Sequence, residues 1–528
     1  CGDCGVKSNC VSVLPLETQF GRKRVIDQSA CNKDYSCVNG LCPSFVSVVG
    51  GKMRKNSPSV NINDTWNYLP DPELPQINGT YNIVLTGVGG TGLVTIGALL
   101  GMAAHLENRG VGILDMIGLA QKGGAVLSHL RIGNSPEDIH SPRIASQGAD
   151  LVIGGDLVVT GGQKTLSVIK SGHTKLVVNS YELITGDFTK NADMIFPSLK
   201  IKQSIQQVAG SDHTEFLDAS RLATALIGDT IATNIFMLGF AYQRGLIPLE
   251  QSSIEKAMEI NGLSVEGNKL AFLWGRRTAH DGKRVSELTA AIVAGFGLKD
   301  PPEGLDELIQ HRADVLKDYQ NKAYVQRYLH LVERVRTLEI DRVPGSTKFT
   351  EAVAAYYFKL LAYKDEYEVA RLYTNGDFMK KINGRFEGDF KLKLHLAPPL
   401  FSKRNAHTGE PVKTAYGPWI LSAMNLLARF KFMRGTAFDP FGKTAERKME
   451  RRLIEEYEQT IEELLPGLSK KNHALAVEIA RIPEQIRGYD LVKQKHVEAA
   501  KLQEKELLKE FSSTVGNTVA LKSAETVS

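Results

Sequence analysis

The sequence predicts an α/β protein in three parts: a cysteine-rich segment, a mixed and mostly parallel α/β domain, and a mainly α-helical C-terminal domain. Three observations support this order. All six cysteines lie within the first 42 residues. An apolar run, a glycine-rich turn and a helical stretch then follow one another between residues 82 and 106, as in a βα unit. From about residue 304 the chain is charged and has the apolar spacing of amphipathic helices.

Composition places the chain among ordinary globular proteins. The apolar fraction is 42% and the charged fraction 23%, and the length suits about three domains of roughly 150 residues. A net charge of +5 that is spread along the chain does not favour binding to nucleic acid. Cysteines confined to one end differ from a secreted disulfide scaffold and predict a cytoplasmic protein with a local metal site. The uncharged stretch Ile83–Leu106 contains TGVGGTG, which disfavours a membrane helix, so no membrane partner is expected.

The cysteine-rich segment favours an iron–sulfur site, with zinc and redox disulfides as alternatives. Thiolate-only ligation suits iron–sulfur clusters or zinc, and the absence of histidine excludes a Cys2His2 site. A proline follows the last cysteine, as in bacterial ferredoxin loops. The basic run at residues 21–24, GRKR, favours a solvated loop, with docking of an acidic ferredoxin as the alternative. The candidate ligands are Cys1, Cys4, Cys10, Cys31, Cys37 and Cys42.

The α/β domain begins with a candidate phosphate-binding loop. Residues 51–80 are rich in Pro, Asn, Asp and Gly and predict a linker. NIVLT then predicts a strand, and Leu93 to Leu106 predict a helix. Glycines between them let the backbone approach a phosphate, and the helix start offers unpaired N–H groups. The candidate binding residues of this loop are Gly87, Gly89, Gly90, Thr91 and Gly92.

The residues after this loop leave an alternative open. GVGILD predicts a second strand and ends at Asp115, about twenty residues past the loop, where an NAD-binding domain carries its ribose-binding acid. AVLSHLRI alternates and predicts a strand that runs back along the sheet instead of a crossover helix. ADLVIGGD and HTKLVVNS predict two more strands. Asn234, in a predicted apolar helix, favours an internally satisfied core group over a functional one.

Several phrases resemble one known family. CGDCGVKSNC, GRKRVIDQSACNKDYSC and GLCPSF resemble the iron–sulfur segment of the long fused indolepyruvate:ferredoxin oxidoreductases, in the 2-oxoacid:ferredoxin oxidoreductase superfamily. QKGGAVLSHLRI resembles the RGG-and-Arg strand of that superfamily's gamma domain, with Lys122 in place of the usual arginine. QIRGYDLVK and FDPFGKTAERKMERRLIEEYE resemble the terminal domain of the same family, whose role is unassigned.

The resemblance implies an enzyme that oxidatively decarboxylates indolepyruvate or another aryl 2-oxoacid to an acyl-CoA and passes electrons to ferredoxin. It implies a 4Fe-4S cluster and coenzyme A as co-substrate. It places thiamine diphosphate and magnesium in an upstream half, since no thiamine motif is visible in this chain. It adds Lys122, Gly123, Gly124 and Arg131 to the candidate cofactor-binding residues.

We expect the chain to be a C-terminal fragment of a homo-oligomeric protein and inactive alone. It begins at Cys1 without a methionine, and the family pattern carries a further cysteine just upstream. Two alternatives remain: an NAD(P)-dependent iron–sulfur oxidoreductase and a non-catalytic electron-transfer subunit. The expected parts are a cysteine segment that ends the thiamine half, a linker, a gamma-type domain, a helical domain and a disordered tail, at residues 1–50, 51–80, 81–280, 300–512 and 513–528.

Overall fold

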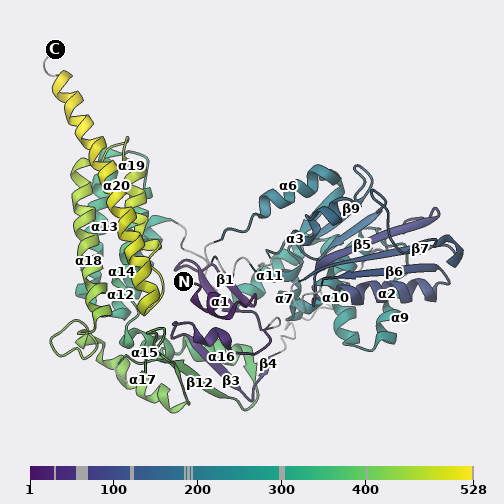
Figure 1. Ribbon diagram of the computed structural model, residues 1–528, viewed down its shortest axis with the longest axis horizontal. Coiled ribbons are helices and arrows are strands. Elements are labelled where there is room, and N and C mark those ends of the chain that lie inside the picture. Colours follow the sequence, from purple (N-terminus) through teal and green to yellow (C-terminus); the bar gives the residue numbers. More distant parts are fainter. Residues whose placement is uncertain are drawn as a thin grey trace.

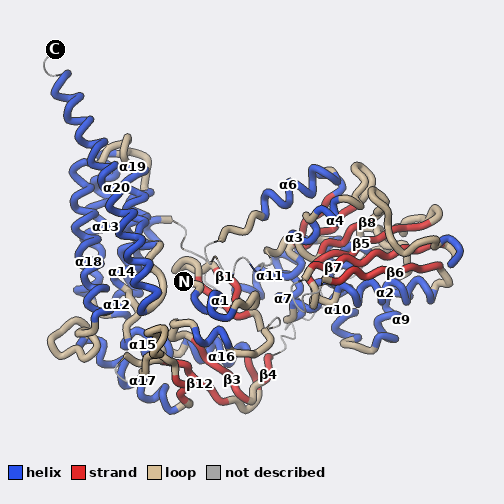
Figure 2. Tube along the Cα trace, in the orientation of Figure 1, coloured by secondary structure: helices blue, strands red, loops and turns tan. Residues whose placement is uncertain are grey.

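The computed structural model describes residues 1–28, 31–54, 69–118, 124–182, 194–295, 304–399 and 402–525, together with the single residues 186, 189, 191 and 302. An α/β body lies at one end of the molecule and a helical bundle at the other, with the N-terminal segment between them (Figure 1). The largest sheet lies in the α/β body (Figure 2). None of the described helices is both long and apolar enough to cross a membrane.

The α/β body is built on a six-stranded sheet with the order β10-β9-β8-β5-β7-β6. Strands β10, β9, β8 and β5 are parallel, and β7 runs antiparallel to both β5 and β6. The returning strand that AVLSHLRI predicted is therefore confirmed. Strand β10 lies in HTEFLDAS, which no sequence pattern had singled out. The strands are β5 (Thr80–Val88), β6 (Gly110–Ile117), β7 (Ala125–Gly133), β8 (Leu151–Gly154), β9 (Lys175–Asn179) and β10 (Thr214–Leu217).

Helices cover both faces of this sheet, and β5 is therefore buried on both sides. Ile83 and Leu85 pack in a core that includes residues of the predicted helix α2 (Leu93–Leu106). Val84, on the other face, packs with a second core that includes Leu157 and Ile205. A strand that alternates between two apolar cores is typical of a three-layer α/β domain. The other helices are α3 (Leu157–Thr160), α4 (Gln163–Leu166), α6 (Ser198–Ala209), α7 (Ala219–Ile227), α8 (Thr233–Gln243), α9 (Gln251–Asn261), α10 (Val265–His280) and α11 (Gly282–Gly295).

The C-terminal part is a helical bundle with a smaller subdomain beneath it (Figure 1). The bundle consists of α12 (Leu305–Tyr319), α13 (Lys322–Arg342), α14 (Lys348–Leu361), α18 (Ala445–Leu464), α19 (His473–Arg481) and α20 (Asp490–Glu525). The subdomain carries α15 (Glu366–Thr374), α16 (Asp377–Arg385) and α17 (Trp419–Arg429). Helix α20 is described through Glu525, and the disordered tail expected from residue 513 stays a prediction.

The cysteine-rich segment pairs with strands of this subdomain, although the two are far apart in the sequence. The helix α1 (Asp3–Ser8) and the hairpin of β1 (Val13–Leu16) and β2 (Lys23–Ile26) are local. Strand β3 (Phe45–Val49) instead pairs with β12 (Lys391–Leu396), which also pairs with β13 (Thr414–Tyr416). Strand β4 (Lys52–Met53) pairs with β11 (Phe386–Glu387). The stretch RFEGDFKLKLHL therefore forms β11 and β12, which pair with β4 and β3.

Candidate functional site

The glycine-rich loop lies at the carboxyl end of β5 and leads directly into α2. Gly90 and Gly92 have φ angles of 89° and 86°, which favour glycine because a side chain there is strained. A Cβ atom added to either residue would meet no heavy atom within 4 Å, so this side of the loop is open. An open glycine backbone at a helix start is suited to bind a phosphate or another anion.

The loop rests on the neighbouring parallel strand. The amide of Gly155, just after β8, donates to the Thr86 carbonyl oxygen at 2.6 Å. A Cβ atom on Gly87 would lie 2.6 Å from Leu93 Cδ1 and 3.3 Å from Asp156 Oδ2, so a side chain there would displace the Leu93 side chain. After β5 the chain continues to β6 on one side of β5, whereas β8 lies on the other side. Ligands of open α/β sheets bind at such a switch point, outside the carboxyl ends of the strands.

A buried asparagine is hydrogen-bonded to the loop. Asn234, 4% exposed on α8, donates from Nδ2 to the Thr91 carbonyl oxygen at 2.6 Å and to Thr91 Oγ1 at 3.3 Å. Thr91 Oγ1 in turn donates to the Val88 carbonyl oxygen at 2.8 Å. The internally satisfied amide that the sequence favoured is therefore present, and its partner is the loop. Asn234 thus connects the loop to the helical layer.

Two further polar side chains support this edge of the sheet, and sequence reasoning had not selected them. Asp156 is buried and accepts from the amide of Val159 at 2.9 Å, which caps α3. Burial raises the pKa of Asp156, while amide hydrogen bonds, including one from Val88, act in the opposite direction. Asn179 donates to the Gly155 carbonyl oxygen at 3.0 Å. Asp156 follows the apolar run of β8, and Asn179 ends β9. A polar residue at the end of an apolar strand was the signal in the sequence that could have identified them.

The structure brings together some of the other predicted residues and separates the rest. Gly124 lies beside the loop, since the amide of Gly89 donates to its carbonyl oxygen at 2.7 Å. Lys122 and Gly123 lie outside the described residues. Arg131 pairs with Asn82, near the opposite end of β5, about 16 Å from the loop at about 3.3 Å per residue. Its guanidinium donates to the side chains of Asn82 and Thr80 and to a backbone carbonyl.

Asp115 also lies away from the loop. It pairs with Ser128 of β7, and β7 separates the whole of β6 from β5. Two strand spacings place it about 10 Å from β5 across the sheet. In a dinucleotide-binding domain the acid follows a strand adjacent to the glycine-loop strand. The sheet order therefore does not support the NAD(P) alternative.

The cysteines lie on one compact segment. A Cβ atom on Gly40 would lie 2.8 Å from the Cα atom of Cys4, so glycine allows the chain around Cys37 to approach α1. Asp3 Oδ2 accepts from the amide of Leu41 at 2.8 Å. Burial raises the pKa of the Cys37 thiol to about 11, and the nearby thiols of Cys4, Cys31 and Cys10 add to the shift.

In this structure the cysteine thiols are not close enough together to bind one metal ion. All six cysteines are free thiols. Among the residues that the structure describes, no group of three or more Cys, His, Asp or Glu side chains is placed to hold a metal ion. An iron–sulfur cluster therefore requires the thiols to lie closer together than this structure places them.

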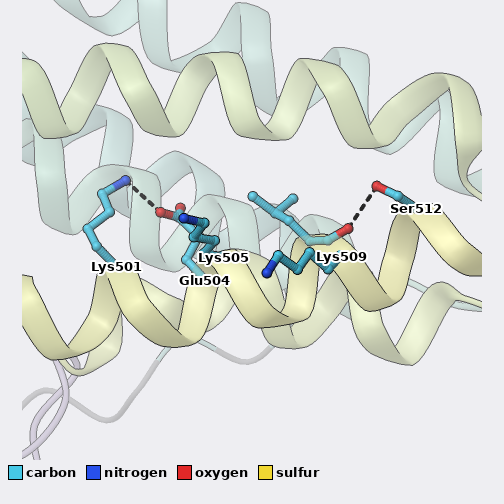
Figure 3. A pocket seen from close by; sticks show the side chains of 6 residues that line it. Lys501, Glu504, Lys505, Lys509 and Ser512 are labelled. Atoms are coloured by element: carbon cyan, nitrogen blue, oxygen red, sulfur yellow. Dashed lines mark hydrogen bonds and ion pairs between the residues drawn. The ribbon is translucent and has the colours of Figure 1, made fainter.

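Two hollows lie on the described surface of the C-terminal part. One, of about 480 Å³, runs along α20, and the side chains of Lys501 and Glu504 pair within it (Figure 3). It contains none of the predicted site residues. The other, of about 160 Å³, lies beside Pro43, directly after the last cysteine, and is also lined by Tyr373, Phe378 and Tyr489.

Comparison with known proteins divides the chain into two matched regions. Residues 82–278 match the pyruvate ferredoxin/flavodoxin oxidoreductase family, and residues 305–506 match a family of unknown function (DUF6537). The indolepyruvate oxidoreductase subunit IorB of Thermococcus kodakarensis is 28% identical over 204 residues, which cover 38% of this chain and 96% of that protein. The IorB subunit of Pyrococcus horikoshii matches with the same identity and coverage.

Solved structures also match part of the chain. A pyruvate oxidoreductase subunit from Thermotoga maritima is 20% identical, with a TM-score of 0.28, over 38% of this chain and 96% of its own. A keto/oxoacid ferredoxin oxidoreductase gamma subunit from Geobacter sulfurreducens has the same identity and TM-score, over 38% of this chain and 98% of its own.

Proposed function

Since residues 82–278 are a domain of the 2-oxoacid:ferredoxin oxidoreductase superfamily, we propose that this chain is part of an enzyme that oxidatively decarboxylates indolepyruvate or another aryl 2-oxoacid. The products are an acyl-CoA and carbon dioxide, and ferredoxin accepts the electrons. The observation that carries the proposal is the match to indolepyruvate oxidoreductase subunits over nearly their whole length. The cytoplasm is the proposed location, because thiols stay reduced there.

In this proposal the open glycine loop binds a phosphate group of coenzyme A. Gly90 and Gly92 leave the backbone accessible, and the start of α2 favours negative charge. Asn234 holds the loop against α8, and the amide of Gly155 holds the end of β5 against β8, so the loop amides need little reorganisation when the anion binds. Thiamine diphosphate with magnesium, bound elsewhere in the enzyme, supplies the carbanion chemistry.

Titration calorimetry with coenzyme A tests the role of the loop. We expect Asn234→Ala to raise the Kd for coenzyme A about tenfold, because the Thr91 carbonyl oxygen loses a buried donor. Asn268→Ala, on α10 of the same domain, is the matched control, because among the described residues its side chain donates to the Leu263 carbonyl oxygen and not to the loop. If both variants bound coenzyme A with equal affinity, the proposal that the glycine loop binds its phosphate would be wrong. Binding of NADH that Asp115→Ala abolishes would replace it with the NAD(P) alternative.

The proposal also assigns a 4Fe-4S cluster to the cysteine-rich segment, with Cys1, Cys4, Cys10, Cys31, Cys37 and Cys42 as the candidate ligands. Thiolates are the ligands that such clusters prefer, and the six thiols share one short segment. Anaerobic reconstitution with iron and sulfide, followed by visible and EPR spectra, is the measurement. We expect iron and colour to be retained, and to fall sharply in Cys37→Ser. A colourless protein that takes up only zinc would contradict the assignment.

A further inference from the structure

The cysteine-rich segment is attached to the C-terminal helical part by backbone pairing. The register of β3 and β12 joins Phe45 to His395 and continues to Val49 and Lys391. Ser47 Oγ and His395 Nε2 lie 2.8 Å apart across this pair. Both strands lie in one sheet beneath the bundle (Figure 1). Val46 and Val48 pack against the apolar core that contains Leu392 and Leu394, so this core is incomplete without the segment.

Two side-chain contacts attach the remainder of the segment. Lys7 on α1 forms an ion pair with Glu410. The guanidinium of Arg312, on α12, donates to the Gln19 carbonyl oxygen and lies 4.6 Å from the centre of the Phe20 ring. Arg312 is 5% exposed, so this contact is an anchor within the packed bundle. The helical domain therefore contacts the segment from α1 to β4, and Thr189 of the α/β domain also donates to Asn9 Oδ1 at 2.6 Å.

Two further contacts lie at the last cysteine and at the proline after it. Lys413 Nζ donates to the Cys42 carbonyl oxygen at 2.5 Å and lies 4.6 Å from the centre of the Phe45 ring. The Tyr373 hydroxyl donates to the Pro43 carbonyl oxygen at 2.7 Å. The Tyr373 ring is 7% exposed and is fixed edge-on against Phe378 at 4.9 Å. Two consecutive carbonyls are thus bound by donors from distant parts of the chain.

We propose that the helical domain, residues 305–506, functions as a clamp for the cysteine-rich segment, and that Lys413 and Tyr373 are the positioning residues for Cys42. This assigns a partner surface to a domain whose family has no known function. A hydrogen bond from an ammonium group to a carbonyl is stronger than a neutral one, so Lys413 contributes most to the hold on Cys42. The clamp needs no metal, and it stands whether or not the proposed reaction is correct.

Hydrogen exchange on the full, metal-free chain tests the clamp. We expect amide exchange across residues 41–49 to become about tenfold faster in Lys413→Met and in Tyr373→Phe, because local opening loses one hydrogen bond. The alkylation rate of the Cys42 thiol should rise in the same variants. Lys413→Arg, which keeps a cationic donor, should restore part of the protection.

Two matched variants distinguish positioning from general destabilisation. Tyr324→Phe removes a hydroxyl that donates to the Leu361 carbonyl oxygen within the same bundle. Lys403→Met removes an exposed ammonium near β13. Both should leave exchange at residues 41–49 unchanged, even where the melting temperature falls. The clamp is overturned if Lys413→Met and Tyr373→Phe leave this exchange unchanged, or if Tyr324→Phe accelerates it equally.

Discussion

Replacing Arg434 with methionine is expected to lower the free energy of unfolding of the helical domain by about 4 kcal/mol. The Arg434 guanidinium donates to both carboxylate oxygens of Asp365, from Nε at 2.5 Å and from Nη2 at 2.8 Å. The side chains are 5% and 3% exposed, so the variant leaves a carboxylate buried without its partner. The guanidinium also lies 3.7 Å from the centre of the Tyr319 ring, and its Nη1 donates to the Tyr319 carbonyl oxygen.

Urea unfolding followed by circular dichroism measures this effect. Arg452→Met is the matched control, since Arg452 and Glu456 form an ion pair with side chains 67% and 39% exposed. Exposed pairs contribute about 0.5 kcal/mol or less, so the control should unfold close to the unaltered protein. A loss below about 1 kcal/mol for Arg434→Met would show that water reaches Asp365 and that the pair is not a buried anchor.

The second large effect is expected in the α/β domain, where Gly275→Ala should lower the free energy of unfolding by about 3 kcal/mol. Helices α8 and α10 cross closely at Gly239 and Gly275. A Cβ atom on Gly275 would overlap the Phe236 carbonyl oxygen and lie 2.8 Å from the Phe240 amide nitrogen. The helices must separate to accept it, and α8 carries Asn234. The variant should therefore also weaken binding at the glycine loop.

Gly282→Ala is the control for this prediction. Gly282 begins α11, and a Cβ atom there would meet no heavy atom within 4 Å. Alanine is the better helix former, so this variant should be neutral or slightly more stable, by up to about 1 kcal/mol. A melting temperature for Gly275→Ala equal to that of Gly282→Ala would mean that the two helices pack less closely than the structure shows.

Much of the α/β domain could be predicted because its signals are local. The apolar run before the glycine loop predicted β5. The uncharged stretch after the loop predicted α2, and the bounds of α2 match those expected. The alternation in AVLSHLRI predicted β7. Strand β10 was missed because TEFL is four residues long and contains a charged residue, so it shows no alternation of apolar and polar residues. Asp156 and Asn179 were missed because a polar residue at a strand end is common in any turn.

The sequence by itself determined β5, β7, α2 and the glycine loop between β5 and α2, because a left-handed backbone at Gly90 and Gly92 and an apolar period depend only on neighbouring residues. Only the tertiary structure decided which elements meet. Arg131, on β7, pairs with the end of β5 that is far from the loop, and Asp115 lies two strands from β5, since strand order is set by global packing. The pairing of β3 with β12 joins residues more than 340 positions apart, and no local pattern encodes so distant a partner.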